Sequence, residues 1–283
     1  MALPFSKRRP DTELSDAKKE SPGSFLRSLA VIALLAWLLR SLIVAPFSIP
    51  TGSMLPTMMM GDHLFVSKWP YGYSSASFPW HVPSFAGRVL GSNPDRGDVA
   101  VFVGPEGADV VKRVIGLPGD LIAVENGVLS INGRPVPRQR IADYAMPVSP
   151  NSPCRVQYAL EGATRRAADG GTLCLYPAYR ETLPEGVSYV TLDQADGLPG
   201  DNFGPVVVPE GHVFMMGDNR DDSADSRFSP SGPIPGMGFI PMDRLVGRAE
   251  RAYWSTDGSA SLIKPWTWFS ALRSDRLGYD YNP

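Results

Sequence analysis

The most apolar run of the chain lies close to its N-terminus, in residues 24–47. Residues 29–39 are uninterrupted apolar, and the apolar character resumes soon after Arg40. About 20 such residues are enough for a helix to span the hydrocarbon core of a bilayer. Arg27 and Arg40 are placed so that their side chains can extend towards the head groups. We therefore predict a transmembrane helix over 24–47; the alternatives are a helix buried in a protein core and a cleaved signal peptide.

The residues before this segment, 1–23, are polar and rich in lysine and arginine, which is typical of a disordered tail. This tail is long for a signal peptide, and Ile43 breaks the small-residue pattern that a cleavage site before Pro46 needs. We therefore expect an uncleaved, single-pass anchor. Because basic residues precede the anchor, the tail is predicted to stay in the cytoplasm and residues 48–283 to lie outside, in the periplasm.

Beyond the anchor, short apolar stretches alternate with turn residues. The expected strands are rich in β-branched and aromatic residues and lie at 62–68, 98–103, 109–116, 121–136, 212–218 and 245–254. Asn126-Gly127 and Asn132-Gly133 are typical hairpin turns. Glycine and proline, 28 of each, also favour many strands and turns over long helices. The sequence therefore predicts a mainly β fold after one N-terminal helix.

The pattern changes at residues 137–205, which are polar and rich in proline and glycine. We interpret them as a smaller subdomain inserted into a β domain that consists of residues 48–136 and 206–258. A C-terminal segment, 259–283, follows, in which 262–275 is expected to form a short helix.

Both cysteines, Cys154 and Cys174, fall in the predicted insert. In an oxidising compartment a disulfide between them would close a loop of about twenty residues and contribute on the order of 3 kcal/mol by chain entropy. Two unpaired, buried thiols are the alternative.

Aromatic side chains gather in residues 68–85 and again near the C-terminus: Trp69, Tyr71, Tyr73, Phe78, Trp80, Phe85, Trp266, Trp268 and Phe269. Rings of this kind favour the bilayer interface, so membrane lipid is an expected partner of this surface. The alternative is that the rings fill an ordinary core.

Composition and motifs exclude several classes of function. The net charge is −2, and no basic cluster, finger or helix-turn-helix spacing indicates a nucleic-acid partner. No cluster of His, Cys, Asp or Glu has metal-ligand spacing, and no glycine-rich motif cradles a phosphate or a dinucleotide. We therefore expect neither a metal nor a cofactor.

One serine, Ser53 in "SIPTGSMLPTM", stands just beyond the anchor and is a candidate nucleophile. The three histidines, His63, His81 and His212, show no pattern that pairs one of them with this serine. A Ser-His-Asp triad is still possible from sequence, because its members meet in space and not along the chain.

Lysine is the other side chain that can accept the proton, provided that its pKa falls far below its usual value. On a strand, Lys112 shares a face with Val110 and Val114. Burial in this apolar row would favour the neutral amine, a usable general base for a Ser-Lys dyad. The alternative is that Lys112 and Arg113 are solvated charges at the edge of a sheet.

A third segment, 216–228, is crowded with Asp, Asn, Ser and Arg directly after an expected strand. Such a segment turns sharply, and it offers Ser223, Asp225 and Arg227 as groups that orient others. A calcium loop is the alternative, but the EF-hand spacing and its terminal Glu are absent.

Taken together, these segments resemble bacterial type I signal peptidase, a family of membrane-anchored Ser/Lys proteases. The matching stretches run in the family's order from about residue 45 to 250: "SIPTGSMLPTM", "GDHLFVSKWPYG", "RGDVAVFV", "VVKRVIGLPGD" and "GDNRDDSADSR". The resemblance implies a mainly antiparallel β catalytic domain with an inserted β subdomain. It also implies that the protein cleaves signal peptides with small residues at positions −1 and −3 from translocated preproteins, at the inner membrane.

The resemblance also implies roles for single residues. Ser53 is the nucleophile, Lys112 its general base, and Ser223 the hydroxyl that positions the lysine. The Ser53 N–H and the Thr51 hydroxyl form an oxyanion hole, a type of donor commonly worth about 10²–10³ in rate. By the same resemblance, the residues that support the catalytic loop are Arg113, Asp218, Asn219, Asp225 and Arg227. Those that line the pockets for small substrate side chains are Ile49, Met54 and Val111.

Three features depart from the family's pattern. Some members have two membrane segments, whereas this chain shows one. Asp222 stands where many members have Asn, and its charge would raise the pKa of Lys112 unless Arg220 or Arg227 neutralises it. Finally, "FSPSGPIPGMG" (228–238) is longer than the usual connection, and we expect a surface loop with no effect on mechanism.

Other functions remain compatible with some of these features. A dedicated conjugal-transfer-type peptidase would use the same dyad on one substrate. A self-cleaving Ser/Lys repressor conflicts with the anchor and lacks a DNA-binding segment. An inactive, anchored peptide-binding β module has no reason to retain Ser53, Lys112 and Ser223 together.

Overall fold

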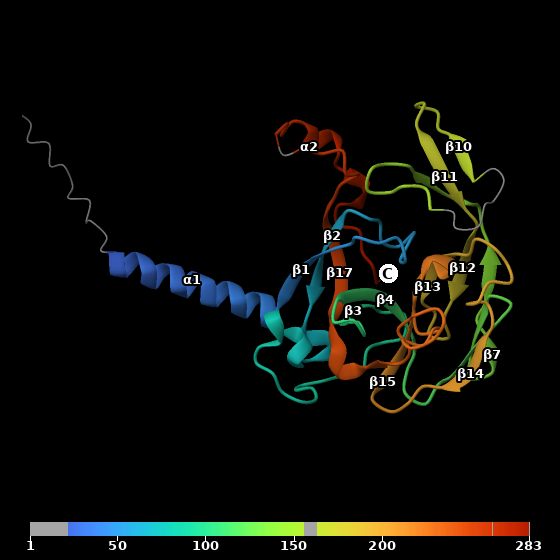
Figure 1. Ribbon diagram of the computed structural model, residues 1–283, viewed down its shortest axis with the longest axis horizontal. Helices are drawn as coiled ribbons and strands as arrows, with labels where there is room; N and C mark the ends of the chain where they lie inside the picture. Colours follow the sequence, from blue (N-terminus) through green and yellow to red (C-terminus); the bar gives the residue numbers. More distant parts are fainter. Residues whose placement is uncertain (1–21, 156–162, 262, 283) are drawn as a thin grey trace, which may run out of the picture. The chain divides into compact units, whose positions relative to one another are not determined.

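The computed structural model describes residues 22–155, 163–261 and 263–282. The predicted tail therefore lies outside the described residues, except for its last two positions. Helix α1 (Pro22–Leu42) contains one stretch, Gly23–Leu42, that is long and apolar enough to cross a membrane, with a mean hydropathy of 1.8 (Figure 1).

The helix ends five residues before the predicted boundary of 47. Residues Val44–Ser48 form strand β1 instead, and this strand pairs with β2 (Asp62–Ser67). The prediction extended too far because the apolar run continues into a strand, and composition alone does not separate the two. Pro46 fits this change, since proline inside a helix removes a hydrogen bond and clashes with the preceding turn.

The main sheet has seven antiparallel strands in the order β1-β2-β17-β3-β4-β15-β16. Its further strands are β3 (Val99–Val103), β4 (Asp109–Gly116), β15 (His212–Met216), β16 (Ile240–Pro241) and β17 (Leu245–Ser255). Register shifts interrupt β17 where it pairs with both of its neighbours, and such bulges bend a strand and increase its twist. The predicted mainly β, antiparallel fold is confirmed.

A second sheet has four strands in the order β14-β5-β6-β7. These are β14 (Phe203–Val207), β5 (Leu121–Glu125), β6 (Val128–Ile131) and β7 (Arg134–Pro135). The two predicted turns connect its hairpins, with positive φ at both residues of each: 50° and 75° at Asn126 and Gly127, and 53° and 74° at Asn132 and Gly133. Asparagine and glycine adopt this conformation most readily, so the turn prediction is confirmed.

Two three-stranded sheets are built from the region predicted as an insert. One has the order β10-β11-β9 and the other β13-β12-β8. Their strands are β8 (Arg138–Arg140), β9 (Tyr144–Pro147), β10 (Thr164–Arg166), β11 (Thr172–Tyr176), β12 (Ala178–Thr182) and β13 (Ser188–Leu192).

Residues 38–283 form one compact unit, and strand β14 starts inside the predicted insert yet pairs with β5 outside it. The division at 137 and 205 therefore stays a prediction. The structure joins Cys154 and Cys174 in a disulfide with 5.4 Å between their Cα atoms.

Short helical segments complete the chain. Helix α2 spans only Thr267–Ser270, within the stretch expected to be helical, and the 3₁₀ turns are Trp69–Tyr71, Ser75–Ser77, Pro79–His81, Arg220–Asp222, Met242–Arg244 and Ser274–Arg276. Of the aromatic residues considered as membrane contacts, Tyr71 is buried in the core, whereas Trp80 and Phe269 are 84% and 82% exposed. Contact with lipid stays a prediction for the exposed rings.

Candidate active site

The segment that carries Ser53 follows β1 and is held by backbone hydrogen bonds at both ends. The Ile49 N–H donates to the carbonyl of Asp62, and the Met58 N–H donates to the carbonyl of Met54, both at 2.9 Å. Asn219, in the loop after β15, adds two bonds: its backbone N–H donates to the Ser53 carbonyl and its side-chain amide to the Gly52 carbonyl, each at 3.1 Å. Ser53 is therefore fixed to the loop that sequence analysis predicted as its support.

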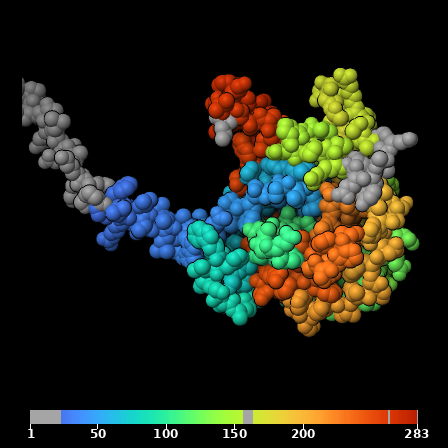
Figure 2. Space-filling view, in the orientation of Figure 1, coloured from blue at the N-terminus to red at the C-terminus, as the bar shows by residue number. Residues whose placement is uncertain are grey.

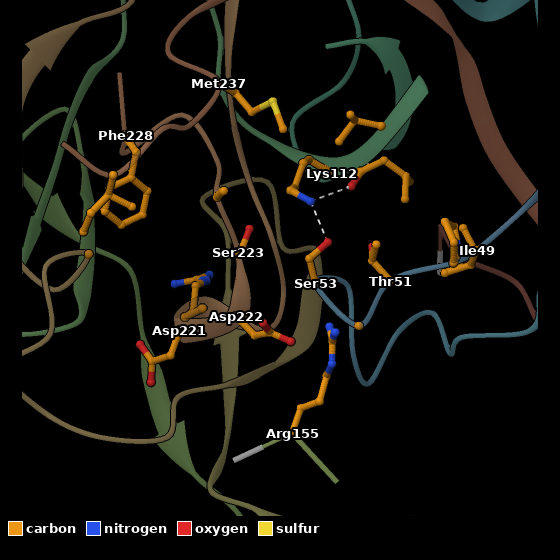
Figure 3. Close-up of a pocket in the computed structure, with 18 of the residues that line it drawn as sticks. Ile49, Thr51, Ser53, Lys112, Arg155, Asp221, Asp222, Ser223, Phe228 and Met237 are labelled. Atoms are coloured by element: carbon orange, nitrogen blue, oxygen red, sulfur yellow. Dashed lines mark hydrogen bonds between the residues drawn. The ribbon is translucent and has the colours of Figure 1, made fainter. Parts of the chain in front are cut away.

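Lys112 lies in the middle of the main sheet. Its strand, β4, is flanked by β3 and β15, so the alternative of solvated charges at a sheet edge is wrong. The side chain is 4% exposed, and its Nζ donates to Ser53 Oγ at 2.6 Å and to the Val111 carbonyl at 3.1 Å (Figure 3). Two residues 59 positions apart in the sequence are thus in direct hydrogen-bond contact.

Burial lowers the pKa of Lys112 to about 8, because removal from water disfavours the ammonium form. The negative charges of Asp225, Asp218 and Asp222 act in the opposite direction, and the positive charge of Arg227 adds to the lowering. Burial outweighs the three carboxylates. The charge of Asp222 therefore raises the pKa of Lys112, as predicted, but the pKa of Lys112 still lies below its usual value.

Next to Lys112, Arg113 points to the other side of β4 and forms a buried ion pair. Its Nε donates to Asp218 Oδ1 at 2.8 Å and its Nη2 to Asp218 Oδ2 at 2.6 Å, while both side chains are 1% exposed. Thr57 Oγ1 donates to the same carboxylate at 2.5 Å, and the guanidinium stacks over the ring of Tyr189 at 4.3 Å. The pair ties β4 to the start of the catalytic loop candidate, residues 217–227.

Within this loop, Asp225 is the central acceptor. It accepts from the Gly217 N–H at 3.0 Å and from Nε and Nη2 of Arg227 at 2.9 Å each. The neighbouring Arg227 guanidinium holds the pKa of the Asp225 carboxyl below its usual value, despite burial. The predicted support by Asp225 and Arg227 therefore matches contacts that fix the turn.

Ser223 lies in the same cleft as the dyad and is 5% exposed. Among the described contacts its hydroxyl makes no hydrogen bond to Lys112, so the predicted positioning role is not visible in this arrangement. Figure 3 shows Ser223 on the side of Ser53 that is opposite to Thr51. Thr51, the predicted oxyanion donor, is exposed at the rim.

Ser53 and Lys112 open into a cleft of about 570 Å³. Segments that are distant in the sequence, coloured blue, green and orange, adjoin on one face of the molecule in Figure 2, and stretches from each of them line the cleft. Of the predicted pocket residues, Ile49 and Val111 line it. Met54 does not: it is 1% exposed and packs in the core with Ile49.

Sequence analysis missed two groups that hold the loop. One is Thr57, four residues after Ser53, which no motif rule distinguishes from an ordinary core threonine. The other is Glu181 on β12, which accepts from Arg220 Nη1 at 3.0 Å and Nη2 at 2.5 Å. Both act through contacts across more than 35 residues, and single-sequence patterns carry no signal for such contacts.

One group of carboxylates in the described chain has metal-ligand spacing: oxygens of Asp193, Asp201 and Asp221 lie within 4.8 Å of one another. Asp193 is also ion-paired with Arg138. Burial and the charge of Asp221 raise the pKa of Asp193 to about 7.

The sequence is similar to known peptidases along most of its length. The family described as "Signal peptidase, peptidase S26" matches residues 23–254. Signal peptidase I of Rickettsia typhi is 34% identical over 290 residues, which cover 95% of this chain and 96% of the relative. Signal peptidase I of Rickettsia rickettsii is 35% identical over 280 residues, covering 92% and 91%.

A solved structure, signal peptidase I from Enterococcus faecalis, also matches. It is 24% identical, covers 56% of this chain and 97% of that structure, and has a TM-score of 0.29. This similarity is too weak to add to the description of the fold.

Proposed function

Because the chain belongs to the signal peptidase family, peptidase S26, we propose that Ser53 and Lys112 form the catalytic dyad of a serine peptidase that removes signal peptides from preproteins. The observation that carries this assignment is the 2.6 Å contact between Lys112 Nζ and Ser53 Oγ. A lysine whose pKa lies near 8 holds a fraction of neutral amine at physiological pH, and that amine is a general base.

The chemistry follows from this contact. Neutral Lys112 takes the proton of Ser53 Oγ as this oxygen attacks the scissile carbonyl carbon. The Lys112 ammonium then returns the proton to the leaving amine, the C–N bond breaks and an ester forms on Ser53. Lys112 next takes a proton from water, whose oxygen attacks the ester carbonyl, and the ammonium protonates Ser53 as the ester breaks.

Negative charge develops on the carbonyl oxygen in both steps. The Ser53 N–H and the Thr51 hydroxyl are the proposed donors to this oxygen, and the loss of one such donor typically costs about 10²–10³ in rate. Ser223 is proposed to hold the amine of Lys112 in place when the group that exchanges a proton with this amine changes from Ser53 to the leaving amine or to water. The structure does not contain a hydrogen bond between these two described residues, so the role requires Ser223 or Lys112 to reorient.

The substrate side of the proposal concerns Ile49 and Val111. Both are apolar and line the same cleft as Ser53, which supports a preference for alanine-like residues at positions −1 and −3. We also propose that α1 anchors the protein in the inner membrane, with the N-terminus in the cytoplasm and the dyad in the periplasm. Its length and hydropathy support this anchoring.

The dyad is tested with the full chain in detergent micelles and a preprotein substrate. Ser53→Ala and Lys112→Ala are each expected to lower the cleavage rate by at least about 10³-fold, the scale of loss when a nucleophile or its base is removed. Lys112→Arg is expected to be equally inactive, because arginine does not give up its proton at neutral pH.

Ser259→Ala and Lys264→Ala serve as matched controls, since both residues lie outside the cleft. Both control variants are expected to cleave at the rate of the unmodified protein. Near-normal cleavage by any of the three dyad variants would show that the assignment is wrong.

A further inference from the structure

The connection 228–238 runs from the catalytic loop candidate to β16, and its sequence predicts a surface loop without a role. The structure confirms a largely exposed loop but also brings part of it to the candidate site. Phe228, Ile234 and Met237 line the same cleft as Ser53 and Lys112. Ile234 is 44% exposed, so a large apolar side chain is presented to solvent inside a substrate cleft.

This loop has a defined conformation. The Met237 N–H donates to the carbonyl of Asp225 at 3.0 Å, and the Gly238 N–H donates to the carbonyl of Phe228 at 2.9 Å. Gly236 lies so close to Phe228 and Asp225 that an added Cβ would stand 2.7 Å from the Asp225 carbonyl oxygen. The loop is therefore fixed to Asp225, the residue that also fixes the turn containing Ser223.

The position of the loop relative to the nucleophile indicates which part of a substrate it meets. Figure 3 shows Phe228 on one side of Ser53 and Lys112, and Ile49 and Thr51 on the other side. A peptide that crosses a nucleophile in an extended conformation advances about 3.3 Å per residue, so residues before and after the cleaved bond lie on opposite sides of it. If Ile49 receives the residues before the bond, the loop faces the residues after it.

We infer that Phe228, Ile234 and Met237 form an apolar subsite for one of the first two residues of the mature protein, at position +1 or +2. This assignment rests on the proposed function, because it takes the Ile49 side of the cleft as the site for positions −1 and −3. The occupant that fits this subsite is an aliphatic side chain such as leucine, which removes both its own apolar surface and that of Ile234 from water.

The test uses the full chain in micelles and three matched signal-peptide substrates with alanine at −1 and −3. The reference substrate has serine at both +1 and +2, the second has leucine at +1 and serine at +2, and the third has serine at +1 and leucine at +2. We expect the unmodified protein to cleave one of the two leucine substrates with a kcat/KM about tenfold higher than the reference, the size that a partly buried aliphatic contact gives.

Ile234→Ser is expected to abolish most of this difference between the leucine and serine substrates, whereas Ile234→Leu should keep it. Val207→Ser is the matched control, because Val207 is a 57% exposed aliphatic residue on β14, outside the cleft. An equal loss on all substrates in Ile234→Ser, or no preference for leucine in the unmodified protein, overturns the inference.

Failure of the proposed function gives a different result. In that case none of the substrates is cleaved, or cleavage persists in Ser53→Ala. Cleavage that depends on Ser53 but ignores the mature residues contradicts only the subsite.

Discussion

At the residue scale, burial and the nearby negative charges act in opposite directions on the pKa of Lys112. Four charged groups affect its pKa, and three of them favour the ammonium form, yet burial keeps the value near 8. Roughly a tenth of the lysine is then neutral at pH 7. The carboxylates that fix the neighbouring loop also favour the ammonium form of Lys112, and they thereby lower the fraction of free base.

A rise in cleavage rate with pH follows from this pKa. In the proposed mechanism the active form is the deprotonated amine, so kcat/KM should rise about tenfold per pH unit below pH 8 and level off above it. Initial rates with one preprotein between pH 6 and 9.5 measure the rising part of this pH–rate profile. A rate that is flat between pH 6 and 8 would mean that Lys112 is not the titrating base.

Asp222→Asn provides an internal check of the same explanation. The negative charge of Asp222 raises the pKa of Lys112, so its removal should move the rising part of the pH–rate profile to lower pH. Asp243→Asn is the control, because Asp243 is an exposed aspartate that is not among the charges affecting Lys112. A profile that stays in place in Asp222→Asn would show that this charge is screened in solution.

At the element scale, β4 connects the two halves of the site, with Lys112 on one face and Arg113 on the other. The sequence predicted this strand because valines and isoleucines flank both residues. It did not predict that β4 lies between β3 and β15, because strand order depends on pairings over about a hundred residues. For this reason the sequence was also compatible with Lys112 and Arg113 as solvated charges at a sheet edge. The order of strands in the sheet excludes this alternative.

Breaking the ion pair beneath β4 should destabilise the protein strongly. Asp218→Ala leaves the Arg113 guanidinium buried without its carboxylate, a change that typically costs about 3–5 kcal/mol in free energy of unfolding. Chemical denaturation of the full chain in micelles, followed by tryptophan fluorescence, measures this loss.

The exposed pair Arg251–Asp280 is the matched comparison, with side chains 65% and 41% exposed. Arg251→Ala is expected to cost about 1 kcal/mol or less, because solvent screens such pairs. Similar losses in Asp218→Ala and Arg251→Ala would show that the buried pair has no special structural role.

At the scale of the whole molecule, local motifs indicated the residues of the proposed dyad but only part of the contacts that hold them in place. Ser53, Lys112 and the 216–228 segment were recognisable because each carries an unusual pattern within a dozen residues. Thr57 and Glu181 were not, since each meets its partner only after the sheets assemble. The end of α1 was missed for a related reason: residues 44–47 are as apolar as the helix, and only pairing with β2 makes them a strand.

The proposed anchor leads to a prediction about the whole chain. Leu34 and Leu35 lie in α1 and are 55% and 59% exposed, and neither lines the cleft, so lysine at both positions should leave the site intact. Each lysine near the centre of a membrane helix costs roughly 2.5–3.5 kcal/mol on insertion scales. The double variant Leu34→Lys, Leu35→Lys should therefore leave the membrane fraction while it cleaves a soluble signal peptide at the normal rate.

Its cleavage of a membrane-tethered preprotein should fall by at least about tenfold, because the anchor no longer raises the effective concentration of enzyme near the substrate. Fractionation and parallel assays on the two substrates measure both effects, and protease added to spheroplasts carrying the unmodified protein reports on orientation. A protected ectodomain would contradict a periplasmic site. A double variant that remains fully in the membrane fraction would place the anchoring elsewhere, and the exposed rings of Trp80 and Phe269 would then be the next residues to test.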